Sequence, residues 1–281
     1  MTLRQRIRFL SLNPGKRATE RFYLVYTAVW GTLTAALMLS GAAVAWGDVP
    51  LMAWGVGLWL PVLVVPLLRR APEDRQKPFH RLYGFKMHAC LLLMAAGGSY
   101  ITFYFYEVLH MHYGFRTQWN LNNVPLFLYF LTVAYFATYS VLLFAGYRFL
   151  NSLLPERTPR PVRALMAVPV SLAVALLETL THATPLMRHL FCYDDVPFML
   201  WFGTPMYAVW FVVWLGLWFP IDERPGDETP LGTALLRTLL AFALIVAASE
   251  IARGWIAPSF TTVVIGAPGL RDYGDSCLLP L

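Results

Sequence analysis

The amino-acid sequence predicts an all-α, polytopic membrane helix bundle with about seven transmembrane helices. The chain has 281 residues, of which 58% are hydrophobic and only 14% are charged, whereas a soluble domain carries about 25% charged residues. Its apolar runs reach the length of about 20 residues that a helix needs to cross a bilayer. These runs leave no room for a separate large soluble domain, so we predict one integral membrane domain over residues 1–281.

Spans and short loops alternate along the chain. Residues 1–21 form a basic arm without a cleavable signal pattern, residues 22–256 form the bundle, and residues 257–281 form a polar tail. Pro61 and Pro66 interrupt the second span, which membrane helices tolerate when neighbouring groups satisfy the freed carbonyls. The predicted spans are 22–46, 51–68, 87–109, 126–147, 164–184, 198–220 and 235–252.

The distribution of positive charge predicts the orientation of the bundle. Most of the 22 Lys and Arg residues lie in the arm and in the loops after spans two, four and six. By the positive-inside rule the N-terminus is cytoplasmic and the C-terminus lies outside. This orientation is opposite to that of seven-helix receptors, and the net charge of +6 reports topology rather than a nucleic-acid partner. The exceptions are Arg116, Arg188, Arg253 and Arg271.

The basic residues are nearly all arginine, which is typical of a GC-rich bacterial gene. We therefore expect the bacterial cytoplasmic membrane as the location, or the endoplasmic reticulum if the protein is eukaryotic. We find no internal repeat, which argues against a transporter built from repeats. The sequence does not predict an oligomeric state.

Glu178 lies inside the fifth predicted span, four residues before His182. A charged carboxylate that faces lipid costs several kcal/mol, so Glu178 should face the protein interior or stay protonated. Residues four apart share a helix face, so Glu178 and His182 form a candidate acid–base pair. The alternative is an interhelical hydrogen bond that supports packing.

Polar residues gather on the predicted outer side, which suggests one polar pocket near that interface. The inner half of the bundle is expected to be nearly free of ionisable groups. The alternative is that outer loops are simply polar, and Glu107 and Glu250 near helix ends could reach water. The outer polar residues are Glu107, His110, His112, Trp119, Asn120, Asn122, Asn123, Glu178, His182, Asp194, Asp195 and Glu250.

No pattern predicts a metal site or a cofactor. His110 and His112 are two residues apart and face away from each other on a helix. The three cysteines, Cys90, Cys192 and Cys277, are widely spaced and form no metal-binding or redox motif. We therefore expect any chemistry to rest on side chains alone.

Trp210, Trp214 and Trp218 repeat every four residues in the sixth span and line one helix face. Aromatic belts normally occupy the two membrane interfaces, but this stripe continues through the core of the span. Indole faces stabilise a desolvated cation by roughly 1 to 2 kcal/mol each. With Tyr207, the stripe predicts a pocket for a flat apolar substrate that becomes cationic, and the alternative is packing against lipid.

Several of these residues lie in motifs that resemble the cycloeucalenol cycloisomerase family of sterol enzymes. The order and spacing of the motifs over most of the chain carry the resemblance. Glu107 departs from it, because the family shows no acid at that position. The motifs are Asn13-Pro-Gly-Lys-Arg17, Phe22-Tyr-Leu-Val-Tyr26-Thr with Trp30, Tyr113-Gly-Phe115, Trp119, Asn122-Asn-Val-Pro125, Phe130-Leu-Thr132, Leu177-Glu178-Thr179, Tyr207-Ala208 and Asp222-Glu223.

The resemblance implies an isomerase of sterol biosynthesis that opens the 9β,19-cyclopropane ring of cycloeucalenol and gives obtusifoliol. An acid protonates the cyclopropyl methylene, positive charge develops at C9, and a base removes the proton from C8. The reaction needs an acid, a base and a cation-tolerant apolar pocket, but no cofactor. The implied partners are a sterol that enters from the lipid phase and the bilayer itself.

The matched positions allow a provisional division of roles. Glu178 is the acid or the carboxylate that faces the cation, and His182 is its partner or the base. Glu107 is a further catalytic candidate. The remaining candidates are Trp119, Asn122 and Asn123, which hold the sterol 3-hydroxyl or order a proton-relay water, and Tyr207, Trp210 and Trp214, which stabilise the cation.

Two other functions stay open from the sequence. One is related isomerase chemistry on another substrate, such as a sterol Δ8–Δ7 isomerase of the emopamil-binding-protein kind or an enzyme for another isoprenoid. The other is a membrane sterol-binding or transport protein without catalytic activity. A transport function would need a polar gate in the inner half of the bundle, which the sequence does not predict.

Overall fold

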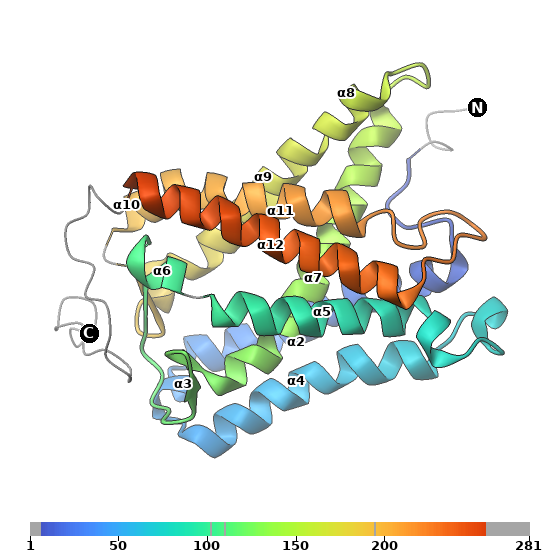
Figure 1. Cartoon of the computed structure of the whole chain (residues 1–281). Helices are drawn as coiled ribbons and strands as arrows, with labels where there is room; N and C mark the ends of the chain where they lie inside the picture. Colours follow the sequence, from blue (N-terminus) through green and yellow to red (C-terminus); the bar gives the residue numbers. More distant parts are fainter. Residues whose placement is uncertain (1–6, 102, 110, 194, 257–281) are drawn as a thin grey trace.

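The computed structural model describes residues 7–101, 103–109, 111–193 and 195–256. These residues form a helix bundle with two very small antiparallel sheets, which confirms the predicted all-α membrane architecture (Figure 1). Helix α11 follows α10 through one π-helical turn. The helices are α2 (Pro14–Leu39), α3 (Ala42–Ala45), α4 (Asp48–Leu68), α5 (Tyr83–Tyr100), α6 (Phe103–Glu107), α7 (Leu126–Leu153), α8 (Arg160–Leu165), α9 (Ala167–His182), α10 (Val196–Phe198), α11 (Thr204–Trp218) and α12 (Leu231–Ile256). The strands are β1 (Met111–Tyr113), β2 (Asn120–Leu121), β3 (Val124–Pro125) and β4 (Phe191–Tyr193).

Six helical segments of the described chain are long and apolar enough to cross a membrane, so this is an integral multi-pass membrane protein. The predicted number of seven spans is not confirmed, because α5 is not among the helices that are long and apolar enough to cross a membrane. Lys86 and His88 lie in α5 and lower its mean hydropathy, yet the helix packs within the bundle against α4, α7 and α12. The six segments are Pro14–Leu39, Asp48–Leu68, Leu126–Leu153, Arg160–His182, Val196–Trp218 and Leu231–Gly254.

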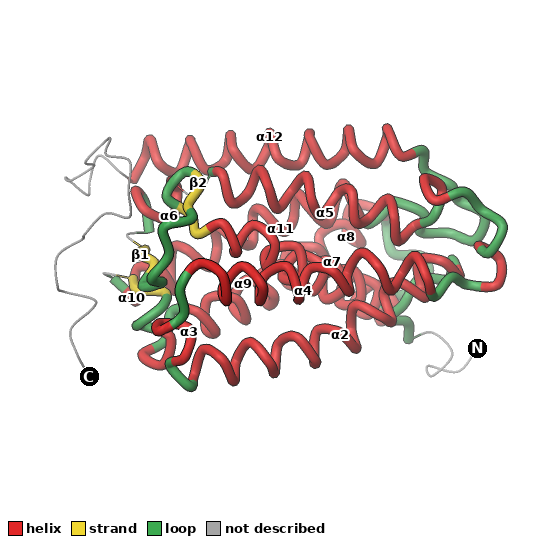
Figure 2. The backbone as a smooth tube through the Cα atoms, turned by 90° about the horizontal axis from the view of Figure 1, so that it is seen from below, coloured by secondary structure: helices red, strands yellow, loops and turns green. Residues whose placement is uncertain are grey.

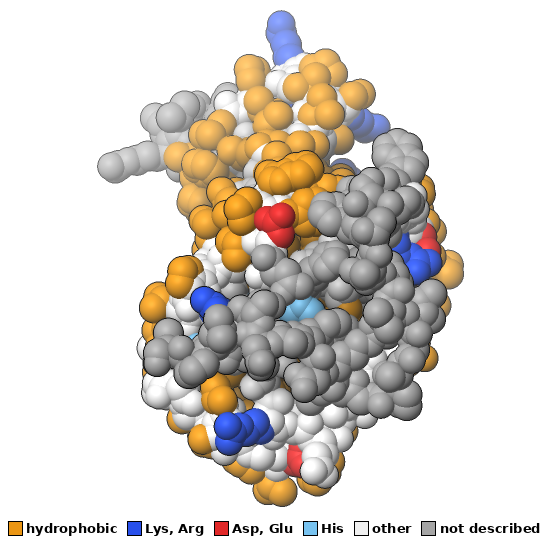
Figure 3. Space-filling model, turned by 90° about the vertical axis from the view of Figure 1, so that its left-hand side faces the viewer, with side chains coloured by type: hydrophobic (Ala, Val, Ile, Leu, Met, Phe, Trp, Pro, Cys, Tyr) orange, Lys and Arg blue, Asp and Glu red, His pale blue; other side chains and the backbone are white. Residues whose placement is uncertain are grey.

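The loops separate to two opposite ends of the bundle, as the alternating spans require (Figures 1 and 2). The basic end, as we call it, holds the start of α2, the loops 69–82 and 219–230, and α8. The sheet end holds α3, α6, α10 and both sheets. Figure 3 looks onto the sheet end and shows hydrophobic side chains along its flanks with charged groups scattered among them. Which end faces the cytoplasm stays a prediction from the charge distribution.

Helix α2 begins at Pro14, so the prediction that the first helix starts at residue 22 is wrong. Asn13 caps the helix, because its Oδ1 accepts hydrogen bonds from the backbone N–H groups of Gly15 (3.1 Å) and Lys16 (3.3 Å). Pro14 at the first helical position is already restricted to a helical φ. The Asn-Pro-Gly-Lys motif is therefore a helix start, and residues 14–21 of the basic arm are helical.

The third predicted span, 87–109, is divided in the structure. Helix α5 starts earlier, at Tyr83, and ends at Tyr100 soon after Gly97 and Gly98. The short helix α6 follows at the sheet end. Glycine has a low helix propensity, and this pair close to the end of α5 explains why one continuous helix does not form.

The basic end, which is the predicted inner side, contains a buried ionic cluster, so the prediction that the inner half is nearly free of ionisable groups is wrong. Lys16 and Glu20 on α2 are 0% and 1% exposed, and Arg148 on α7 is 8% exposed. Arg148 pairs with Glu20 and with Glu223, at 2.7 Å in each case. Lys16 Nζ lies 2.9 Å from Glu223 Oε2. These four side chains, the ionic cluster, join α2, α7 and the loop before α12.

Candidate active site

Five helices enclose the main cavity of the described structure. Helices α5, α7, α9, α11 and α12 form a closed ring, since each packs on the next and α12 returns to α5. Helices α2 and α4 lie outside this ring, against α5 and α7. The cavity has a volume of about 160 Å³ and is partly open to its surroundings. An engineered cavity of about 150 Å³ binds benzene, so this volume accommodates an apolar group of about that size.

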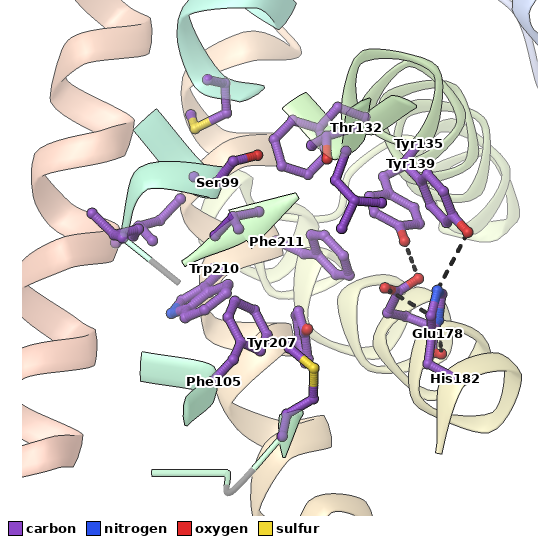
Figure 4. Close-up of a pocket in the computed structure, with 18 of the residues that line it drawn as sticks. Ser99, Phe105, Thr132, Tyr135, Tyr139, Glu178, His182, Tyr207, Trp210 and Phe211 are labelled. Carbon is purple, nitrogen blue, oxygen red and sulfur yellow. Dashed lines mark hydrogen bonds and ion pairs between the residues drawn. The ribbon is translucent and has the colours of Figure 1, made fainter. Parts of the chain in front are cut away.

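The wall of the cavity is mostly aromatic, and one group of polar side chains gathers around Glu178, away from Ser99 and Thr132 (Figure 4). Glu178 and His182 on α9 both line the cavity, as predicted, with side chains 14% and 12% exposed. The opposite face of α9 carries exposed leucines, which suits contact with lipid. These leucines are Leu172, Leu176, Leu177 and Leu180.

Glu178 and His182 are held as a pair. Glu178 Oε1 lies 3.4 Å from His182 Nδ1, which is one helical turn further along α9. The same Nδ1 lies 2.9 Å from the backbone carbonyl oxygen of Glu178 and 3.1 Å from the hydroxyl of Thr181. The imidazole ring also packs edge-on against Phe191, with ring centroids 5.0 Å apart. The imidazole ring is therefore fixed in orientation beside the carboxyl group.

Two tyrosines on α7 complete the polar group, and sequence reasoning missed both. The hydroxyl of Tyr139 donates a hydrogen bond to Glu178 Oε2. The hydroxyl of Tyr135 lies 3.3 Å from His182 Nε2. The cavity-lining residues of α7 recur at helical spacing, but nothing in the sequence marks this face of the helix as the one that meets the cavity. They are Leu128, Thr132, Tyr135, Phe136 and Tyr139.

The tryptophan stripe faces protein rather than lipid. Trp214 and Trp218 are 2% and 0% exposed. Trp210 and Trp214 line the cavity together with Tyr207, as predicted, whereas Trp218 lies beyond it toward the basic end. The ring of Phe136 meets Trp214 edge-on at a centroid distance of 4.8 Å. The interpretation of the stripe as packing against lipid is therefore wrong, and Trp210 and Trp214 form part of the cavity wall.

The sheet of β1 and β4 forms part of the cavity wall at the sheet end. The two strands pair antiparallel, with Met111 opposite Tyr193 and Tyr113 opposite Phe191. All four side chains line the cavity. Burial raises the pKa of Tyr193. Burial likewise raises the pKa of Tyr113. Both phenols therefore stay protonated beside Glu178.

Replacing Gly114 with alanine is expected to lower activity several-fold by displacing this sheet. A Cβ atom at Gly114 would lie 2.1 Å from the backbone oxygen of His189, so one of the two backbone segments has to move. The movement would shift Tyr113 and the strand that carries it. Turnover and thermal stability of Gly114→Ala, compared with Gly232→Ala where a Cβ has open space, provide the measurement. Equal activity of the two variants would contradict the expectation.

Trp119, Asn122 and Asn123 do not line the cavity, so the structure does not support their predicted contact with substrate. Asn122 and Asn123 have φ values of 54° and 63° between β2 and β3. Two consecutive left-handed residues form a type I′ hairpin turn, for which asparagine is well suited. Asn122 also donates to the backbone oxygen of Tyr100. Trp119 is 46% exposed on the same hairpin. These residues shape the loop between α6 and α7.

The other predicted polar candidates either lie away from the cavity wall or belong to the part of the chain that the structure does not describe. Glu107 ends α6, and its side chain is not among the described ones. Glu250 pairs with Arg253 at 2.7 Å on α12. Asp195 caps α10 by accepting a hydrogen bond from Phe198 N at 2.8 Å. His110 and Asp194 lie outside the described residues. Within the described part of the chain, no group of three or more His, Cys, Asp or Glu residues is placed to hold a metal ion.

Fold and site together define a multi-pass membrane protein whose helices enclose an acid–histidine pair within an aromatic wall. The chain is 27% identical to the cycloeucalenol cycloisomerase of Arabidopsis thaliana over 256 residues, which cover 89% of this chain and 90% of that protein. This similarity supports a relation at the level of a family. No protein-family model matches the chain. No solved structure matches it either.

Proposed function

We propose that the protein is a sterol isomerase that opens the 9β,19-cyclopropane ring of cycloeucalenol-type sterols to give the Δ8 sterol obtusifoliol. The observation that carries the proposal is the Glu178–His182 pair inside an aromatic cavity within the membrane. The name of the Arabidopsis relative and its similarity over nearly the whole chain support the reaction class. The step belongs to sterol biosynthesis.

The reaction is an isomerisation in which no atoms are gained or lost. A proton adds to C19 as the C9–C19 bond breaks, which creates the methyl group and leaves positive charge at C9. Loss of the proton from C8 then forms the 8,9 double bond. Acid–base catalysis by positioned side chains contributes about 10²- to 10⁴-fold to such steps. Oxidation state does not change, so the chemistry requires no cofactor.

The cavity residues match the requirements of this reaction. Glu178 serves as the acid or as the carboxylate that faces the cation, with His182 as its partner or the base. The faces of Tyr207, Trp210 and Trp214 stabilise the positive charge at C9, since aromatic faces attract cations by roughly 1 to 2 kcal/mol each when water is excluded. The apolar remainder of the wall accommodates the ring system.

The sterol reaches the cavity from the lipid phase, because both the substrate and the outer surface of the bundle are apolar. The exposed leucines of α9 lie on the helix that carries Glu178 and His182. We expect the protein to act in the bacterial cytoplasmic membrane, or in the endoplasmic reticulum if the protein is eukaryotic. The substrate therefore never has to cross bulk water.

A product assay in heavy water tests the proposed function. Membranes from sterol-free bacteria that contain the protein receive cycloeucalenol, and the sterols are analysed by gas chromatography and mass spectrometry. The expected product is obtusifoliol with one deuterium in the C19 methyl group. Unchanged cycloeucalenol from correctly inserted protein would refute the proposal. Turnover of a different sterol or sterol binding without turnover would then favour a Δ8–Δ7 isomerase-like enzyme or a binding protein.

A further inference from the structure

We infer that Glu178 is the acid and His182 the base of this reaction, that Tyr139 positions Glu178, and that Tyr135 relays the C8 proton to His182. The inference rests on the proposed function and assigns the two proton transfers to two separate side-chain pairs. Each pair joins one residue of α9 to one tyrosine of α7 (Figure 4). The two tyrosines are four residues apart and therefore lie one helical turn from each other.

The contacts of the imidazole define which ring nitrogen is basic. His182 Nδ1 lies 2.9 Å from the backbone carbonyl oxygen of Glu178, and a carbonyl oxygen can only accept a hydrogen bond. Nδ1 therefore carries the hydrogen. In a neutral imidazole the other nitrogen then holds the lone pair. That nitrogen, Nε2, lies 3.3 Å from the hydroxyl of Tyr135, so Tyr135 donates to it.

The same distances favour a neutral Glu178–His182 pair in the resting protein. Nδ1 lies closer to the backbone oxygen of Glu178 (2.9 Å) than to the carboxyl Oε1 (3.4 Å). An imidazolium beside a carboxylate would form a short charge-assisted hydrogen bond to the carboxylate instead. Two charges in this apolar cavity would each also lose their hydration. Glu178 is therefore a carboxylic acid with a proton to give, and His182 is a base whose Nε2 lone pair accepts the hydrogen bond from Tyr135.

The hydrogen bond from Tyr139 fixes the carboxyl group of the acid. Its hydroxyl donates to Glu178 Oε2, which leaves Oε1 as the atom that carries the acidic proton. When that proton leaves, the bond from Tyr139 strengthens, because a hydrogen bond to an ionised acceptor is stronger than one to a neutral group. Tyr139 therefore acts through Glu178 and is a positioning residue.

The complete step balances within the cavity. The proton of Glu178 adds to C19, and the C9–C19 electron pair becomes the new C19–H bond. The C8–H bond breaks, its electron pair forms the double bond to C9, and the proton moves to the oxygen of Tyr135. The original hydroxyl proton of Tyr135 passes to His182 Nε2. Glu178 is then a carboxylate beside an imidazolium, and net transfer of one proton from His182 to Glu178, directly or through water, resets the pair.

Isotope effects separate the two tyrosines. The experiment uses cycloeucalenol with hydrogen or deuterium at C8 and the variants Tyr135→Phe and Tyr139→Phe. Tyr135→Phe is expected to lower kcat by about 10²-fold or more and to raise the C8 deuterium isotope effect, because proton removal becomes limiting. Tyr139→Phe is expected to raise the solvent isotope effect and leave the C8 effect unchanged. A variant that only disturbs the fold would lower the rates of both proton transfers and would not change one isotope effect without the other.

Tyr129→Phe is the matched control. Tyr129 lies on the same helix and donates to the backbone oxygen of Leu121 at 2.9 Å, but it does not line the cavity. We expect wild-type isotope effects for this variant. An unchanged C8 isotope effect in Tyr135→Phe, or an increase in Tyr139→Phe instead, would overturn the assignment while leaving the proposed function intact. Absence of turnover in the wild-type protein would refute the proposed function itself.

A second measurement does not depend on turnover. ¹⁵N NMR of the protein in bilayers reports which ring nitrogen of His182 carries hydrogen, and a His182→Gln sample identifies its signals. The expected state is neutral, with hydrogen on Nδ1 and a bare Nε2. An imidazolium, or hydrogen on Nε2 alone, would overturn the assignment of His182 as the base. This result stands even if a tyrosine variant fails to fold.

Discussion

Glutamine in place of Glu178 is expected to lower kcat by about 10²- to 10⁴-fold, the range that acid–base catalysis supplies. Glutamine has nearly the same shape as glutamic acid, and its amide oxygen can still accept the hydrogen bond from Tyr139. The amide cannot deliver a proton to C19. The fold and the affinity for sterol should therefore persist while the reaction stops. Obtusifoliol formation by the purified variant in lipid nanodiscs is the measurement.

Glu250→Gln provides the control for this prediction. It makes the same chemical change in another membrane helix, at a residue that is paired with Arg253 and does not line the cavity. Its turnover should equal that of the wild-type protein. If Glu178→Gln also turned over at the wild-type rate, Glu178 could not be the acid, and one of the cavity tyrosines would have to supply the proton. Glu178→Asp distinguishes chemistry from position, because it keeps the acid but withdraws it by one methylene.

The fold was largely predictable because lipid imposes a simple rule on sequence. A spanning segment must be a long apolar helix, so hydropathy alone located six of the segments that the structure contains. The errors in the predicted helix bounds occur where a capping hydrogen bond or a glycine pair, rather than hydropathy, determines where a helix begins or ends. Asn13 starts α2 eight residues early through a capping hydrogen bond. Gly97 and Gly98 end the third helix early, and the residues of α6 fold separately.

A residue of the candidate site could be identified from the sequence where its polarity does not suit the apolar segment around it. Glu178 is a carboxyl group within an apolar span, so its position alone indicates a special environment. Tyr135 and Tyr139 carry no such signal, because tyrosine is common in membrane helices and its hydroxyl is an inconspicuous polar group. Their placement beside Glu178 and His182 depends on the rotation of α7 relative to α9. That rotation comes from packing between helices distant in sequence, which a single sequence does not contain.

Motif resemblance alone does not separate residues of the cavity wall from residues of the scaffold. The Asn-Pro-Gly-Lys motif and Asp222-Glu223 both lie at the basic end, far from the cavity wall. Lys16 and Glu223 belong to the ionic cluster. Asp222 pairs with the buried Lys86. The resemblance to a sterol enzyme family therefore identifies a shared scaffold as much as a shared active site, and roles must be assigned from geometry.

Replacing Arg148 with methionine is expected to lower the free energy of unfolding by about 3 to 5 kcal/mol. Arg148 donates five hydrogen bonds, two to each of Glu20 and Glu223 and one to the backbone oxygen of Phe9. Methionine fills part of the same volume but leaves the buried carboxylate of Glu20 and the half-buried carboxylate of Glu223 with Lys16 as the remaining cation of the ionic cluster. Equilibrium unfolding in mixed detergent micelles measures the loss.

Arg253→Met tests whether burial is the cause. Arg253 and Glu250 are also 2.7 Å apart, but their side chains are 38% and 41% exposed. An exposed ion pair contributes about 0 to 1 kcal/mol, so this variant should unfold almost as the wild-type protein does. Similar losses in the two variants would contradict the view that the ionic cluster is stabilising because its charges are sheltered from water.

A double variant distinguishes lost charge balance from lost packing. Lys16, Glu20, Arg148 and Glu223 together carry no net formal charge. Arg148→Met leaves this set with one excess negative charge, and adding Glu20→Gln restores neutrality. If the unpaired carboxylate causes the loss, the two changes should be non-additive by about 0.5 to 3 kcal/mol, with the double variant more stable than the sum predicts. Simple additivity would instead mean that Arg148 stabilises the basic end by filling space between α2 and α7. In either case activity per folded molecule should stay at the wild-type level, because the ionic cluster does not line the cavity.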